Sequence, residues 1–178
     1  MSGSAGYLTR QAIFATLFPV PPRPRILDEL RQTRPFPSRA DEALVSLLRT
    51  TDVLRRHLGR CTEESEVTPQ QYNVLRILRG AGSEGIPTLE IASRMIEQTP
   101  GITRLLDRLE AKGLVRRQRC PEDRRQVLCW ITEPGLELLA ALEAPVAKAA
   151  KEAFRKLSAA EIDTLLGLLE RLRSTCTG

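Results

Sequence analysis

Apolar residues recur at intervals of three and four along most of the chain. This spacing gathers side chains on one face of a helix and predicts a mainly α-helical protein. Ser-x-x-Glu and Thr-Pro sequences supply helix-start signals, and glycines mark several expected ends. We expect helices over residues 38–60, 69–80, 88–95, 99–113, 133–156 and 158–172.

The period changes to two after Gly113. Residues 115–119 and 126–131 each have the alternation of a strand, and a charged Pro-Glu-Asp-Arg-Arg sequence separates them. This pattern predicts a β-hairpin with a charged tip. Short helix, tight turn, helix and hairpin over residues 88–131 is the order of a winged helix-turn-helix. The expected fold class is therefore mainly α with a small β-hairpin wing, flanked by N- and C-terminal helices.

A chain of 178 residues is long enough for one compact domain with a helical annex. We expect four segments. Residues 1–24, rich in Pro and Gly, form a disordered tail or arm, and residues 66–132 form the winged helix-turn-helix DNA-binding domain. Residues 25–62 and 133–178 supply the N- and C-terminal helices, whose leucine-rich faces have too little partner surface within one chain and therefore predict dimerisation.

The charge favours an anionic polymer as partner. The formal net charge is +5, and all but four of the 27 basic residues are Arg. Arg makes forked contacts to phosphates and base edges, whereas Lys acts as a point charge. Eight basic and four acidic residues lie between Pro100 and Trp130, so the expected winged domain carries most of the charge excess of the folded part.

The expected helix over residues 99–113 has the character of a DNA-recognition helix. Its apolar positions must face the core, which leaves a polar face that can enter the major groove. The residues expected to contact DNA are Thr99, Gly101, Thr103, Arg104 and Arg108. Of these, Arg104 or Arg108 can grip a guanine edge, and Gly101 permits close backbone approach.

The hairpin tip is the second candidate DNA contact. Arg124 and Arg125 lie side by side at the tip, and Arg125 in particular can enter the narrow minor groove. Asp123 can hold the tip or a neighbouring Arg through a salt bridge.

Two motifs resemble the MarR family of bacterial winged-helix regulators over residues 38–173. They are Thr99-Pro100-Gly101 with Arg104-Leu105-Leu106-Asp107-Arg108-Leu109-Glu110, and Pro121-Glu122-Asp123-Arg124-Arg125 running into Ile131-Thr132-Glu133-Pro134-Gly135. The resemblance implies a homodimer on double-stranded DNA and gives Asp123 and Arg125 the family's wing positions. It also implies a repressor released from a pseudo-palindromic operator by a small aromatic or phenolic effector. Tyr72, Arg76 and residues 54–58 could line the effector crevice, although Tyr72 has core spacing.

Two other interpretations remain open. Cys61 lies among basic residues, an environment that favours reactive thiols, so it is a candidate redox site for a thiol-sensing regulator. The second interpretation is a winged-helix module that binds another protein and does not read DNA. Cys120 and Cys129 fall on the two expected strands, where a small buried apolar role is the commoner one.

Catalytic and metal chemistry find little support. The chain has a single His, no C-x-x-C pair and no catalytic motif, so we expect no metal, no cofactor and no enzyme activity. No apolar run approaches the roughly 20 residues of a membrane span, and we expect no membrane partner. The cysteine pattern fits the reducing cytoplasm.

Overall fold

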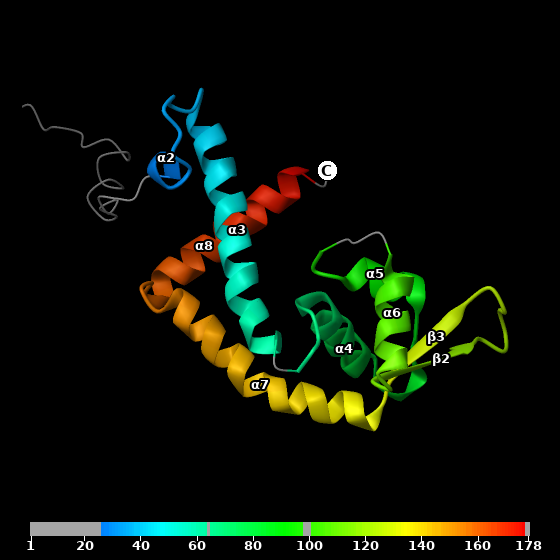
Figure 1. Ribbon diagram of the computed structural model, residues 1–178. Coiled ribbons are helices and arrows are strands. Elements are labelled where there is room, and N and C mark those ends of the chain that lie inside the picture. The colour runs from blue at the N-terminus through cyan, green and yellow to red at the C-terminus, as the bar shows by residue number, and fades with distance from the viewer. Residues whose placement is uncertain (1–25, 64, 98–100, 177–178) are drawn as a thin grey trace, which may run out of the picture. The chain divides into compact units, whose positions relative to one another are not determined.

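The computed structural model describes residues 26–63, 65–97 and 101–176 (Figure 1). Residues up to Thr50 and residues from Thr51 onwards form two units, and each is described by itself. The first unit contains α2 (Ile26–Glu29) and the beginning of α3 (Arg39–Glu63). The arm expected over residues 1–24 lies outside the described residues.

The start of α3 agrees with its sequence signal. The Ser38 hydroxyl accepts a hydrogen bond from the Asp41 backbone N–H at 3.1 Å and donates one to the Asp41 carboxylate at 2.6 Å. These bonds satisfy groups that a helix end would otherwise leave unpaired. The helix ends at Glu63, three residues beyond the expected Arg60, since no breaker follows Arg60.

The second unit contains the predicted winged helix-turn-helix. Its elements are α4 (Pro69–Ala81), the 3-10 turn η1 (Gly82–Glu84), β1 (Ile86–Pro87), α5 (Thr88–Arg94), α6 (Ile102–Ala111), β2 (Val115–Arg119) and β3 (Val127–Ile131). The helices α7 (Glu133–Phe154) and α8 (Ala159–Cys176) follow. Figure 1 shows the β2–β3 hairpin extending beyond α6 as a wing. The sequence prediction of the fold class is confirmed.

The sheet is antiparallel with strand order β1-β3-β2. In the hairpin, Arg117 pairs with Cys129 and Arg119 with Val127, while Ile86 of β1 pairs with Cys129 from the other side. The expected hairpin is therefore present in full, and the short strand β1 pairs with β3 as a third strand. The Cys120 N–H donates to the Gln126 carbonyl at 3.0 Å. Cys120 therefore lies opposite Gln126 and does not face Cys129.

One apolar core joins the helices to the sheet. It contains Val74, Leu75 and Leu78 of α4, Ile91 of α5, Leu106 and Leu109 of α6, Cys129 of β3 and Leu139 of α7. Burial of this surface supplies the main driving force for folding of the lobe. The core fixes the orientation of α6, because its apolar stripe must face α4 and the sheet.

Helix caps explain several boundaries. The Thr68 hydroxyl accepts from the Gln71 N–H at 3.2 Å and the Gln71 side chain accepts from the Thr68 N–H at 3.0 Å, a complete capping box for α4. Threonine is a common N-cap residue, so Thr88 at the start of the 88–95 helix predicts a cap. This prediction is wrong: Pro87 holds the cap position of α5, and the Thr88 hydroxyl donates to the Val127 carbonyl at 3.2 Å. The Thr88 hydroxyl thus bonds to strand β3 and not to the backbone of its own helix.

Trp130 anchors the root of the wing to the turn after α4. Its indole N–H donates to the Ser83 carbonyl at 3.0 Å, and the Arg116 guanidinium lies 4.1 Å from the ring centroid. Gly85 lies directly against the ring, where any Cβ would approach a ring carbon to 2.3 Å.

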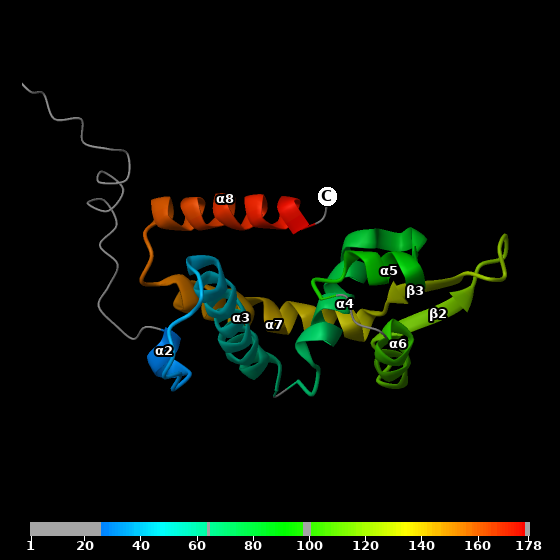
Figure 2. The same cartoon turned by 90° about the horizontal axis from the view of Figure 1, so that it is seen from above.

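The last two helices extend from the lobe. Thr132 caps α7 by accepting from the Gly135 N–H, as expected, and α7 packs against α4. Figure 2 shows that α8 turns away from α7 after Phe154. No residue of α8 is buried within the described chain, although its sequence is rich in leucine.

Candidate nucleic-acid interface

The helix α6 presents the polar face that its sequence predicts. Leu105, Leu106 and Leu109 are buried. Gly101, Thr103, Arg104 and Arg108 are exposed. Thr99, the fifth expected contact on this helix, lies outside the described residues. The helix itself begins at Ile102, later than the Thr99-Pro100 signal suggests.

Gly101 is the N-cap of α6 and has φ +113°, a conformation that residues with a Cβ rarely adopt. Its carbonyl accepts from the Arg104 N–H at 2.9 Å. Apart from Gly101 itself and its chain neighbours, no atom of the described residues lies within 4 Å of the position that a Cβ would occupy. The open space leaves the helix N-terminus accessible to a phosphate or a base edge.

The wing tip is built around Asp123. Its carboxylate accepts from the Arg125 backbone N–H at 3.0 Å, from Arg125 Nε at 3.4 Å and from the Gln126 amide at 3.2 Å. These bonds lower the pKa of Asp123, with the Arg125 N–H as the largest cause. The sequence expectation that Asp123 holds the tip agrees with these contacts.

Both tip arginines point to solvent. The Arg125 side chain is 93% exposed despite its contact with Asp123, and Arg124 is also exposed. A guanidinium held near a fixed backbone but open to solvent is available for a phosphate or a groove.

The recognition helix and the wing border a common groove. A cavity of about 600 Å³ lies between α5, α6 and the hairpin. Thr103 of α6 and Arg125 of the wing both line it, together with Leu89 of α5 and Gln126. The two sets of residues expected to contact DNA are therefore adjacent in space.

Arg117 of β2 links the wing strand to α6. Its Nε donates to Glu110 at 2.9 Å and its Nη2 donates to Asp107 at 2.6 Å. The hydrogen bond to Glu110 raises the pKa of Arg117, and Asp107 adds to this against the opposing effect of burial. The sequence prediction gave Asp107 and Glu110 no role in the candidate site. Their i, i+3 spacing ahead of a basic strand was the only signal for this contact.

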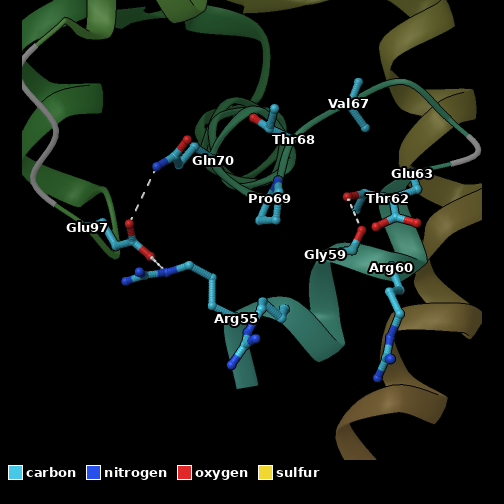
Figure 3. Close-up of a pocket in the computed structure, with 11 residues that line it drawn as sticks. Arg55, Gly59, Arg60, Thr62, Glu63, Val67, Thr68, Pro69, Gln70 and Glu97 are labelled. Carbon is cyan, nitrogen blue, oxygen red and sulfur yellow. Dashed lines mark hydrogen bonds and ion pairs between the residues drawn. The ribbon is translucent and has the colours of Figure 1, made fainter. Parts of the chain in front are cut away.

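A second candidate site lies between the end of α3 and the turn after α5. Two cavities, of about 590 Å³ and 240 Å³, share Arg55, Pro69, Gln70 and Glu97 as lining residues. Arg55 Nε donates to Glu97 at 2.8 Å, and the Gln70 amide reaches the same carboxylate at 3.5 Å. Figure 3 shows both side chains directed toward Glu97.

The smaller cavity has an apolar wall formed by Leu54, Leu58, Met95 and Ile96. The expectation that residues near 54–58 line a crevice agrees with this cavity. Tyr72 and Arg76 line neither cavity: Tyr72 packs against the core, and Arg76 lies over its ring at 6.0 Å. Tyr72 lies between the lining residues Gln70 and Asn73 in sequence, but its side chain is on the core face of α4.

The cysteines and the single histidine form no metal-ligand cluster in the described part of the chain. Cys129 is buried, and burial raises the pKa of its thiol. Cys61 is half-buried, with its Sγ 3.8 Å from the Pro145 carbonyl, which accepts from the thiol. Among the residues that the structure covers, no helix is long and apolar enough to cross a membrane.

Comparison with known proteins agrees with this architecture. The MarR family model matches residues 67–127. The chain is 34% identical over 118 residues to a protein named as a transcriptional regulatory protein for the hcr operon of Thauera aromatica. That match covers 66% of this chain and 70% of the relative.

Two solved structures extend the comparison. A MarR transcription factor from Planctomyces limnophilus is 42% identical, with a TM-score of 0.60 over 76% of this chain and 98% of that chain. A mutant MarR from E. coli complexed with operator DNA is 28% identical, with a TM-score of 0.65 over 71% of this chain and 89% of that one. Proteins of this family are transcription factors and not enzymes. The chain belongs to the MarR family of transcriptional regulators.

Proposed function

We propose that this protein is a sequence-specific repressor that binds double-stranded DNA as a homodimer. The observation that carries the proposal is the common groove of α6 and the wing, with Thr103 on one side and Arg125 on the other. In this arrangement α6 enters the major groove, where Arg104 and Arg108 read guanine edges. The wing then lowers Arg125, assisted by Arg124, toward the adjacent minor groove.

The proposed dimer uses α3, α7 and α8, the helices outside the winged lobe. Three leucines of α8 and two of α3 are exposed: Leu166, Leu168 and Leu172, and Leu44 and Leu48. Exposed large apolar side chains on helices of this kind are typical of an interface. In a dimer bound to a pseudo-palindrome, the two recognition helices would lie roughly 34–36 Å apart, one turn of the duplex.

The first experiment is selection of bound duplexes from a random pool at near-physiological salt. We expect an enriched pseudo-palindrome with half-sites about one turn apart, and a steep fall of log affinity with log salt. Arg104→Ala should relax the preference at one base pair by about 1–3 kcal/mol. Lys151→Ala on α7 is the control for loss of one positive charge. A folded dimer that enriches no sequence would favour the alternative of a protein-interaction module.

We further propose that the crevice around Arg55 binds the effector. Its apolar wall suits an aromatic ring, and Arg55 suits a carboxylate or phenolate. Such an anion would compete with Glu97 for Arg55. Glu97 lies four residues before the N-cap of α6, so a change in this ion pair would act close to the start of the recognition helix.

The effector proposal is tested with benzoate and salicylate against the neutral benzamide. We expect the two anions to raise the melting temperature and to release the selected duplex, and Arg55→Gln to abolish both effects. Arg79→Gln is the matched control, because Arg79 pairs with Glu143 outside the crevice. Release by peroxide that disappears in Cys61→Ser would instead support thiol sensing. Equal responses to anions and benzamide would refute the role of Arg55.

A further inference from the structure

Arg117 makes polar side-chain contacts from the wing to the recognition helix. Two of its guanidinium nitrogens donate to Glu110 and Asp107, which lie one helical turn apart on α6. The Arg117 side chain is only 21% exposed, while those of Asp107 and Glu110 are 52% and 40% exposed. Charge-assisted bonds to a planar guanidinium fix direction as well as distance.

The position of these contacts on α6 is informative. Asp107 and Glu110 follow Thr103 along one flank of the helix, and Thr103 and Arg117 line the same groove beside the wing. Arg104 and Arg108 lie toward the other flank at 100° per residue. Arg117 therefore contacts the flank of α6 that faces the wing and leaves the flank with Arg104 and Arg108 open to a ligand.

The opposite end of the same link reaches α5. Arg117 pairs with Cys129 across the hairpin, and the Cys129 thiol lies 3.6 Å from the Thr88 hydroxyl. Thr88 in turn donates to the Val127 carbonyl. The contacts join α5, both wing strands and α6 through consecutive neighbours.

We propose that Arg117 is a positioning residue, which fixes the angle between the recognition helix and the wing so that both read DNA at once. This inference rests on the proposed DNA-binding function. Apolar packing of Leu105, Leu106 and Leu109 fixes which face of α6 meets the lobe, but apolar contact carries little directional restraint against small rotations about the helix axis. The forked ion pair adds a directional restraint against such rotations, and its one positive charge offsets part of the negative charge of Asp107 and Glu110.

The test separates position from charge through three variants. Arg117→Lys keeps the charge and loses the fork, and Arg119→Gln removes a charge from the same face of β2, two residues away. Asp107→Asn with Glu110→Gln removes both acceptors from α6. For each, affinity is measured for the selected duplex and for a scrambled duplex, alongside urea unfolding.

We expect Arg117→Lys and the double acceptor variant to lower the ratio of specific to scrambled affinity by about tenfold, comparable with one mismatched base pair. Arg119→Gln should weaken both affinities by the same factor. A fourth variant exchanges the charges, Arg117→Glu with Glu110→Arg. Its ratio of specific to scrambled affinity should be higher than that of Arg117→Glu alone, because the ion pair can form again with the charges exchanged. Restoration is a result that simple loss of folded protein would not give.

An unchanged ratio in Arg117→Lys and in the acceptor variant would overturn the proposal. So would a ratio that falls only in step with the folded fraction. If Arg117→Lys fails to fold, the acceptor variant decides alone. A wild-type protein that shows no preference for any duplex would refute the proposed function itself, which is a separate result from a preference that survives removal of Arg117.

Discussion

Gly85 has φ +76° and ψ 169°, a backbone region populated almost only by glycine, and it lies against the Trp130 ring. Gly85→Ala should therefore add backbone strain to a direct clash. We expect the free energy of unfolding to fall by about 2–5 kcal/mol, measured by urea denaturation. Loss of the native Trp130 fluorescence should accompany this change, because Trp130 is the sole tryptophan of the chain.

Gly82→Ala is the matched control for that substitution. Gly82 also has a positive φ, +72°, but apart from its chain neighbours no atom of the described residues lies within 4 Å of its Cβ position. This variant should show the backbone strain alone, about 1–3 kcal/mol, with unchanged fluorescence. Equal losses in the two variants would mean that Trp130 moves aside without cost.

Asp123 gives the wing tip a defined pH response. Its pKa is lowered in the folded protein by the Arg125 N–H and then by Gln126. A carboxyl group with a depressed folded pKa contributes stability above its unfolded pKa of about 3.9, and that stability is lost as pH falls through the folded pKa. We expect the difference in melting temperature between wild type and Asp123→Asn to be constant from pH 7 to about pH 5.

Below about pH 4 the same difference should shrink toward zero, because protonated Asp123 no longer holds its charged-state bonds. Melting curves followed by circular dichroism between pH 7 and 2.5 measure it. Glu122→Gln, the exposed neighbour, controls for loss of one negative charge at the tip. A difference that grows at low pH would contradict the role of the ionised carboxylate.

At the scale of elements, the two capping boxes provide a comparison. Thr68 begins α4, which contributes Val74, Leu75 and Leu78 to the core. Ser158 begins α8, which has no fully buried residue within the described chain. Thr68→Ala should lower the free energy of unfolding by about 1 kcal/mol in urea denaturation. Ser158→Ala should leave the unfolding midpoint of the lobe unchanged and alter helix content only.

A matched loss in both variants would indicate that α8 unfolds cooperatively with the lobe. The control is Thr164→Ala, because the Thr164 hydroxyl bonds to the Ala160 carbonyl inside α8 and caps no helix. Its effect measures the loss of a hydroxyl without the loss of a cap.

Local signals predicted most elements. Apolar periodicity and caps identified the helices and the hairpin, because both depend on contacts within a few residues. The errors arose where a distant partner competes. Thr88 bonds across to β3 and does not cap α5, and α6 starts at a positive-φ glycine two residues after the expected Thr99.

The candidate site also combines features that local sequence predicts with contacts that it does not predict. The exposed face of α6 and the Asp123 turn follow from local spacing, so their geometry agreed with expectation. The Arg55–Glu97 pair joins residues 42 apart in sequence, and no periodicity encodes such a contact. Arg117 and Glu110 are only seven apart, but recognising their contact requires the register between a strand and the preceding helix.

At the scale of the whole molecule, the exposed leucines of α8 are the strongest indication of a partner copy. Leu168 and Leu172 lie one turn apart and are 53% and 48% exposed. Completing the burial of such a side chain contributes about 1 kcal/mol, and a two-fold interface would bury four of them. Glutamate at these positions would instead bury unpaired charges, which costs more than the leucines contribute.

We therefore expect Leu168→Glu with Leu172→Glu to convert the dimer to a monomer in sedimentation velocity at micromolar concentration. Binding to the pseudo-palindrome should fall with it, because a monomer engages one half-site alone. Leu89→Glu is the matched control for sedimentation: Leu89 is 83% exposed but lies on α5, and its substitution should leave the dimer intact. A wild-type monomer, or a dimer that survives both α8 substitutions, would place the interface elsewhere and remove the basis for two half-sites one turn apart.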